Sequence, residues 1–190
     1  NIKQLIKYIP LSQKLGYYDS PRFHGWKLKE ANQKFYAHMP VSLLLKHIGE
    51  EKFNGLFKFT VVRNPFDQFL SWYFWQQATG GRSVRSEFKP FLRKRAEEFF
   101  DSNKRVILVN GKTVVDDVLR YEHLVEDFFR INKKLNLPEK TIQSYDEITT
   151  NGFTRKTRGY DLIDTEAKEL IIEKADYFFT QFGYSRDVPT

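Results

Sequence analysis

The segment from residue 57 to residue 73 constrains the fold of this chain most, because an apolar run ends in an arginine and passes at once into a helix start. Residues 56–62 are typical of a strand. Asn64 has the side chain of a helix N-cap, Pro65 suits the first helical position, and Asp67 complements the positive end of the helix dipole. The segment therefore predicts a strand, a tight turn, and a helix over residues 65–77.

This junction has the features of an anion site. Arg63 stands at the expected strand end, and Ser71 follows about two turns into the helix. Their side chains and the free N–H groups of the helix start can converge on one phosphate or sulfate. The same residues also fit an ordinary strand–helix junction whose arginine makes a surface ion pair. Local sequence leaves both interpretations open.

Composition narrows the possible functions. A chain of 190 residues predicts one domain, and a net charge of +7 favours an anionic partner such as a nucleotide, a sulfated or phosphorylated sugar, nucleic acid or an acidic membrane surface. The absence of cysteine excludes disulfides and thiolate chemistry, and the four histidines lack metal-binding spacing, so we expect no metal site. We find neither a membrane-spanning stretch nor a signal peptide, which predicts a cytoplasmic protein.

Hydrophobic periodicity predicts the remaining elements. Asn110-Gly111, between two β-rich runs at 106–109 and 113–115, is a strong hairpin signal. A short strand is expected at 118–121 and surface loops at 17–34, 80–83 and 143–164. Helices are expected over residues 1–16, 41–48, 88–100, 122–135 and 165–179. Helices interspersed with short strands predict an α/β fold with a small, mostly parallel sheet.

Further residues have side chains suited to catalysis or binding. For each of them, a structural or surface role is the alternative. His38 is either a hydrogen-bonded structural histidine or a base near a bound anion. Tyr121, at an expected strand end, either packs in the core or stacks on a nucleotide base. Arg155, Lys156 and Arg158 lie in a glycine-bounded loop that either wraps an anion or is plain surface.

Several of these stretches together resemble the sulfotransferases that use 3′-phosphoadenosine-5′-phosphosulfate (PAPS). Arg63-Asn-Pro-Phe-Asp67, with Ser71 eight positions after the arginine, resembles their 3′-phosphate-binding motif. The similarity extends, in order, from about residue 35 to residue 184. It includes the Tyr-x-His segment that ends at His38, the Arg-Tyr-Glu-x-Leu segment around Tyr121, and the Phe-Gly-Tyr of residues 182–184.

The resemblance implies roles for five residues at a nucleotide site. Arg63 and Ser71 would hold the cofactor's 3′-phosphate, and Tyr121 would contact the adenine. Arg155 and Lys156 are similar to the late basic loop that closes over the same phosphate. These roles are expectations that the family resemblance supplies.

The resemblance also implies a reaction and a fold. His38 would deprotonate an acceptor hydroxyl or amine, on a carbohydrate or small molecule, as it attacks sulfur in line. Adenosine 3′,5′-bisphosphate (PAP) would be the product. The implied fold is a P-loop-like, three-layer α/β/α arrangement, and no metal or nucleic acid is expected. Sulfuryl transfer resembles phosphoryl transfer in needing positioned positive charge.

The sequence departs from the family at one signature. We find no glycine- and lysine-containing loop before His38 to hold the 5′-phosphosulfate. Either the sequence begins after that strand and loop, which we expect, or it is a degenerate member that binds without transferring.

Two other functions compete with a sulfotransferase. One is a non-catalytic binder of anionic polysaccharide or nucleotide, which would use the basic loop and the basic face of the helix over 88–100, with Lys89, Arg93, Lys94 and Arg95. Such a face is also common on plain solvated surface. The other is a P-loop kinase, which lacks its Gly-x-x-x-x-Gly-Lys-Ser/Thr motif in this sequence.

Overall fold

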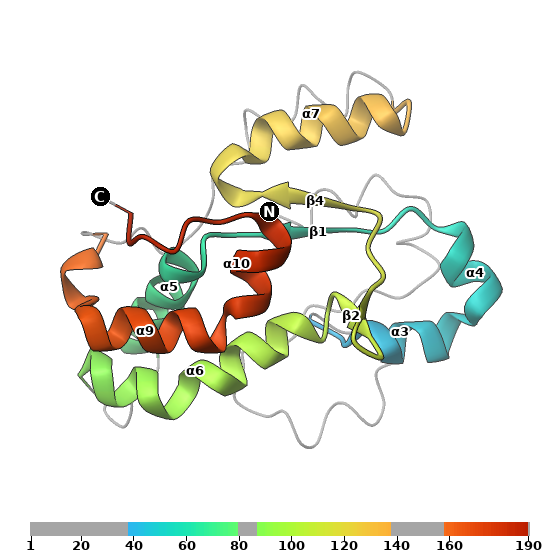
Figure 1. Cartoon of the computed structure of the whole chain (residues 1–190). Helices are drawn as coiled ribbons and strands as arrows, with labels where there is room; N and C mark the ends of the chain where they lie inside the picture. Colours follow the sequence, from blue (N-terminus) through green and yellow to red (C-terminus); the bar gives the residue numbers. More distant parts are fainter. Residues whose placement is uncertain (1–37, 80–86, 138–157, 190) are drawn as a thin grey trace. The chain divides into compact units, whose positions relative to one another are not determined.

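The computed structural model describes residues 38–79, 87–137 and 158–189 (Figure 1). The helix expected over 1–16, the loops at 17–34 and 80–83, and most of the loop at 143–164 lie outside these residues.

The chain divides into two compact units, each assembled from separate stretches of sequence. The described part of the first unit comprises residues 38–60, 104–117 and 125–137. The described part of the second comprises residues 61–79, 87–103, 118–124 and 158–189. The expectation of a single domain stays a prediction.

A small parallel sheet pairs strands β1 (Phe59–Val62) and β4 (Asp117–Arg120), which run side by side in Figure 1. The pairing begins where the Asp116 N–H donates to the Lys58 carbonyl at 2.7 Å. Both strands were predicted, although β1 starts later than expected. Mixed helices and strands give a broadly α/β architecture, and within the described ranges each sheet has two strands.

The described part of the first unit begins with two short helices. The predicted helix appears as α3 (Val41–Ile48), and its first N–H donates to the Arg105 carbonyl at 2.8 Å. Gly49, with φ of 83°, ends α3 and lets the chain turn at once into α4 (Glu50–Gly55), which was not predicted. Leu56, where β1 was expected to begin, instead caps α4 by donating its N–H to the Phe53 carbonyl at 3.3 Å.

The hairpin prediction is confirmed. Strands β2 (Leu108–Val109) and β3 (Lys112–Thr113) pair antiparallel, and Leu108 lies opposite Thr113. Asn110 and Gly111 have φ of 50° and 75°, the positive values that a type I′ turn requires.

Helix α7 (Leu124–Lys134) follows a 3₁₀ turn, η3 (Tyr121–His123), so the helix begins later than predicted. Phe128 and Ile131 are buried as expected. Asn132 is also buried, and neither polar atom of its side chain has a partner in the described part of the chain. Burying this amide without hydrogen bonds lowers the free energy of unfolding.

Besides η3, the described part of the second unit contains five helical segments, of which α6 extends by one residue beyond the unit. They are α5 (Pro65–Thr79), α6 (Phe88–Lys104), η4 (Tyr160–Leu162), α9 (Thr165–Lys174) and α10 (Asp176–Phe182). The prediction of one helix over 165–179 is wrong, because the backbone turns at buried Ala175. Asp164 caps α9 by accepting the Ala167 N–H at 3.0 Å.

Phenylalanine rings form the core of the second unit. Phe69 of α5 is fully buried, and its ring centroid lies 5.4–6.1 Å from those of Phe88, Phe91, Phe99 and Phe100 of α6. These edge-on, tilted and stacked pairs stabilise packing beyond their buried area. The core thereby fixes α5, the helix that follows Arg63. None of the described helices combines the length and apolar character needed to cross a membrane.

Candidate functional site

Arg63 and Tyr121 meet at one edge of the parallel sheet. Arg63 directly follows β1, and Tyr121 directly follows β4. The Arg63 guanidinium carbon lies 4.1 Å from the centroid of the Tyr121 ring, a close cation–π contact. In open α/β sheets, ligands bind beyond the carboxyl ends of the strands, where these two side chains lie.

Asp67, in the first turn of α5, holds the Arg63 guanidinium. Nε of Arg63 donates to Asp67 Oδ2, Nη2 forms an ion pair with the same oxygen, and the two side chains are only 20% and 13% exposed. Tyr160 of η4 donates its hydroxyl to the other oxygen, Oδ1, at 3.2 Å. A guanidinium carries five N–H donors. Pairing with Asp67 therefore orients Arg63 and leaves donors for a second anion.

The start of α5 is capped as predicted. Asn64 Oδ1 accepts the N–H of Phe66 at 3.0 Å, which satisfies one of the helix's terminal donors. Ser71 is half-buried and lies four residues after Asp67, so the two share one face of α5. The structure thus places Arg63 just before α5, and Asp67 and Ser71 in the first two turns of the helix.

Glu122 connects this turn to the C-terminal part of the chain. Its Oε1 accepts the backbone N–H of Asn64 at 2.7 Å, and its Oε2 accepts the hydroxyl of Tyr184 at 3.0 Å. Sequence reasoning did not single out Glu122. Its place after Tyr121 in the Arg-Tyr-Glu-x-Leu segment was the signal that could have found it.

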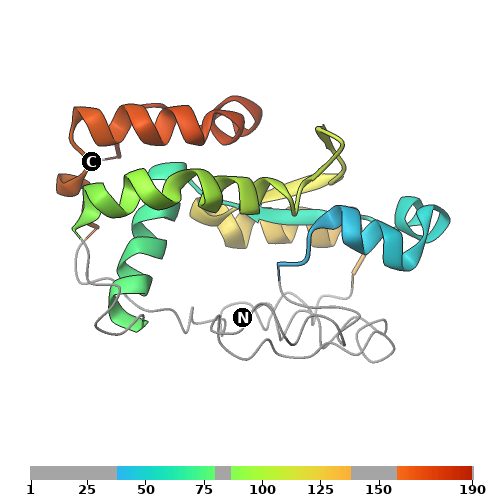
Figure 2. The same cartoon turned by 90° about the horizontal axis from the view of Figure 1, so that it is seen from below.

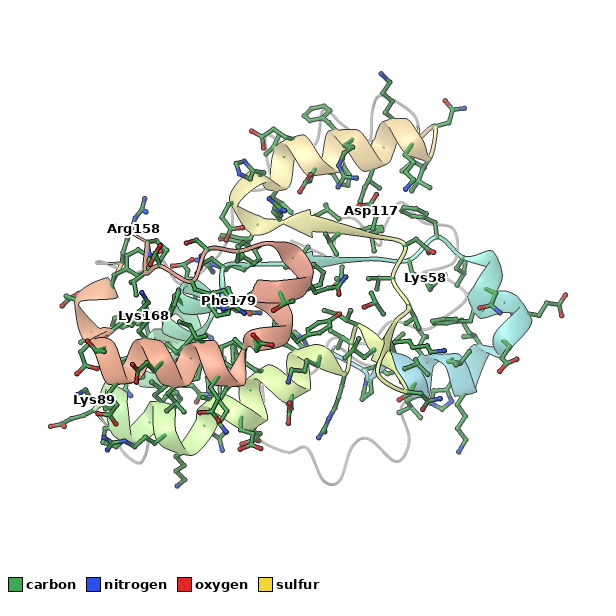
Figure 3. The ribbon with its side chains drawn as sticks, viewed as in Figure 1. Lys58, Lys89, Asp117, Arg158, Lys168 and Phe179 are labelled. Atoms are coloured by element: carbon green, nitrogen blue, oxygen red, sulfur yellow. The ribbon has the colours of Figure 1, made fainter. Side chains whose placement is uncertain are left out.

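The end of the late basic loop rests on α5. Arg155 and Lys156 lie outside the described residues, so their expected role stays a prediction. Gly159 packs so closely on α5 that a Cβ there would lie 2.5 Å from Phe74 Cε2. Arg158 is exposed and extends outward from the ribbon (Figure 3), with no ion-pair partner in the part of the chain that is described.

His38 is exposed and has a φ of 60°. This left-handed backbone conformation is uncommon outside glycine, and histidine adopts it more often than most residues. His38 belongs to the first unit, whereas Arg63, Ser71 and Tyr121 belong to the second. The structure therefore brings Arg63 and Tyr121 together, and the convergence of His38 with them stays a prediction.

Acidic side chains of the second unit neutralise part of the basic face of α6. Lys89 pairs with Asp164 and Glu166, and Arg93 donates from Nε to Glu166 at 2.9 Å. Figures 1 and 2 show α6 and α9 side by side. The hydrogen bond and charge of Asp164 raise the pKa of Lys89, and the hydrogen bond from Arg93 lowers the pKa of Glu166. These pairings reduce the charge that α6 offers to a polyanion.

No cluster of His, Asp or Glu suited to a metal ion occurs within residues 38–79, 87–137 and 158–189. The site combines a guanidinium, an aromatic ring and a helix N-terminus, with Ser71 in the second turn of that helix, and the carboxylates of Asp67 and Glu122 hold Arg63 and the turn before the helix. These groups suit an anion with an attached planar ring.

No protein-family model matches this sequence, and no solved structure matches it. Among curated proteins, it is similar to an uncharacterized protein from Archaeoglobus fulgidus, with 27% identity over 109 residues that cover 54% of this chain and 86% of that protein. The name of that relative gives no activity, so the likeness indicates no function for this chain.

Proposed function

We propose that this chain is a PAPS-dependent sulfotransferase, which moves a sulfuryl group to an acceptor hydroxyl or amine on a carbohydrate or small molecule. One observation supports it most directly. Arg63 and Tyr121 are in contact at the carboxyl ends of two adjacent parallel strands, beside the capped start of α5.

The chemistry of this edge suits a 3′-phosphorylated adenosine. A guanidinium makes strong, charge-assisted hydrogen bonds to phosphate oxygens, and a helix N-terminus adds favourable dipoles. Tyr121 keeps 38% of its surface exposed, which leaves part of the side chain accessible to adenine. In the proposal Arg63 and Ser71 bind the 3′-phosphate, and Arg155 and Lys156 close over it.

The proposed reaction is a direct in-line transfer. The acceptor oxygen or nitrogen forms a bond to sulfur as the bond from sulfur to the 5′-phosphate oxygen breaks, and His38 takes the acceptor's proton. PAP then leaves with the electron pair of the broken bond. The transition state needs positioned positive charge, and no metal takes part.

The proposed function also implies a specific fold and a cellular location. We propose that β1 and β4 belong to the sheet of a P-loop-like, three-layer α/β/α domain. We also propose that the enzyme works in the cytoplasm.

Calorimetric titration with PAP, with adenosine diphosphate as the control ligand, tests the proposal. We expect the chain to prefer PAP, and Arg63→Ala to weaken PAP binding by about 2 kcal/mol, because a charge-assisted contact is lost. Arg93→Ala removes the same charge from the outer face of α6 and should bind PAP like the unmodified chain. Equal affinity for the two nucleotides would refute the function, and full PAP affinity in folded Arg63→Ala would refute the site.

The competing function is non-catalytic binding of acidic polysaccharide, which the net charge of +7 favours. The pairing of Lys89 and Arg93 with acidic residues weighs against it. A binder that acts by charge alone loses affinity steeply with salt for every polyanion. A nucleotide site instead keeps its preference for the 3′-phosphate as salt rises.

A further inference from the structure

We infer that Glu122 is a positioning residue, which fixes the turn that carries Arg63 and joins the C-terminal residues 182–184 to the same site. Its two carboxylate oxygens accept hydrogen bonds from two remote stretches of chain, the N–H of Asn64 at 2.7 Å and the hydroxyl of Tyr184 at 3.0 Å. The inference rests on the proposed function only for the identity of the ligand.

The bond to Asn64 fixes the backbone at a sensitive place. Asn64 stands between Arg63 and the first residue of α5, and its own side chain caps that helix. The bond from its N–H ties the turn to Glu122, at the end of the neighbouring strand β4. A small shift of this turn moves both the guanidinium and the helix N-terminus, and binding groups tolerate little misplacement.

The C-terminal segment is attached at two points. Arg120 Nη2 donates to the carbonyl of Phe182 at 3.1 Å, and its guanidinium carbon lies 5.9 Å from the Tyr184 ring centroid. Glu122, two residues later, binds the Tyr184 hydroxyl. Gly183, with φ of 67°, provides the bend between these two attachments. The C-terminal segment therefore holds one carboxylate oxygen of Glu122, and Asn64 holds the other.

The exposure of Glu122 distinguishes a positioning role from a role in stability alone. Glu122 is solvent-exposed, and exposed hydrogen bonds and charges contribute little to the free energy of unfolding. Removing its carboxylate should therefore change geometry more than stability. A purely structural residue would have the reverse effect.

The test compares Glu122→Ala, Glu122→Gln and Tyr184→Phe in the full chain. The readouts are hydrogen exchange at the Asn64 N–H, affinity for PAP and Tm. Glu122→Ala should speed exchange and weaken PAP binding about tenfold, with a Tm change of no more than about 3 °C. Tyr184→Phe should also speed exchange at Asn64, because Glu122 loses its second anchor.

Glu122→Gln should restore both exchange and affinity. Its amide oxygen can accept the Asn64 N–H, and its amide N–H can donate to the Tyr184 oxygen. The matched control is Glu169→Ala, because Glu169 is exposed on α9 and its side chain makes no hydrogen bond or ion pair within the described residues. This control should leave all three readouts unchanged.

Unchanged exchange and affinity in Glu122→Ala would overturn the inference, and so would equal losses in Glu122→Ala and Glu122→Gln. Failure of the proposed function looks different. If the unmodified chain shows no preference for PAP over adenosine diphosphate, the function falls. The exchange data then still decide whether Glu122 and Tyr184 hold the turn.

Discussion

Replacing Gly159 by alanine isolates the effect of one close contact, because Gly183 provides a matched control. The two glycines have φ of 74° and 67°, so an alanine at either position has the same unfavourable backbone conformation. A Cβ at Gly159 would lie 2.5 and 2.7 Å from two ring carbons of Phe74, whereas a Cβ at Gly183 has no atom within 4 Å. The difference between the variants therefore reports the contact with Phe74.

The expected magnitudes follow from these two costs. A left-handed alanine costs about 1–2 kcal/mol, and about 0.4–1 kcal/mol of that is offset by the lower entropy of the unfolded chain. Gly183→Ala should thus lower the free energy of unfolding by about 1 kcal/mol. Gly159→Ala adds a forced movement of the half-buried Phe74 ring, typically worth about 1–3 kcal/mol. We expect a total of about 2–4 kcal/mol at Gly159.

Denaturation by urea, followed by circular dichroism, measures both free energies of unfolding. Titration with PAP on the folded Gly159→Ala protein adds a functional readout. Gly159 stands between Arg158 and Tyr160, whose hydroxyl binds Asp67, so a displaced loop should also weaken PAP binding. If Gly159→Ala is no less stable than Gly183→Ala, the packing argument is refuted.

Three further predictions concern single side chains. Asn132→Leu should raise the free energy of unfolding by about 1–3 kcal/mol, because the buried Asn132 amide lacks partners among the described residues. The control Asn103→Leu removes a hydrogen-bonded amide and should give no gain in the same denaturation assay. Burial raises the pKa of Asp116, but hydrogen bonds from Lys58 outweigh it and leave the pKa below its ordinary value. The stability that the Lys58–Asp116 pair adds should be present above about pH 4 and disappear as the pH falls further. The difference in the free energy of unfolding between the unmodified chain and Asp116→Asn should therefore shrink in acid. A difference that stays constant with pH would contradict this. His38→Ala should keep PAP affinity and reduce sulfuryl transfer about a hundredfold, and full activity in a transfer assay would exclude it as the base.

Local signals predicted the elements that local forces determine. Asn110-Gly111 defined the hairpin because its turn needs two residues that accept positive φ. Asn64 and Pro65 defined the start of α5 because capping involves only neighbouring residues. These predictions are confirmed at the residue level.

The secondary-structure predictions are wrong where packing against residues distant in sequence determines the backbone conformation. The turn at Ala175 has no glycine or proline to mark it, and the buried position of that residue depends on the rest of the second unit. Helix α4 is six residues long, too short for periodicity to reveal. In both places tertiary contacts override the local pattern.

Sequence supplied the candidate residues of the site but few of their contacts. Arg63 and Tyr121 were singled out separately, yet their contact joins residues far apart in the chain and could not be derived from either segment. Asp67 was expected to interact with the helix dipole, and the structure adds its pairing with Arg63. Pair contacts of this kind depend on strand order, which periodicity does not specify.

The second unit is assembled from stretches as remote as residues 61–79 and 158–189, and this has a consequence during synthesis. Helix α5 buries Phe66 against Phe179, with ring centroids 5.2 Å apart, so residue 66 waits for a packing partner that is synthesised much later in the chain. Contacts of such long sequence separation slow folding and leave apolar segments exposed to aggregation while they wait. We therefore expect chains released early, without residues 158–189, to be prone to aggregation and to depend on chaperones.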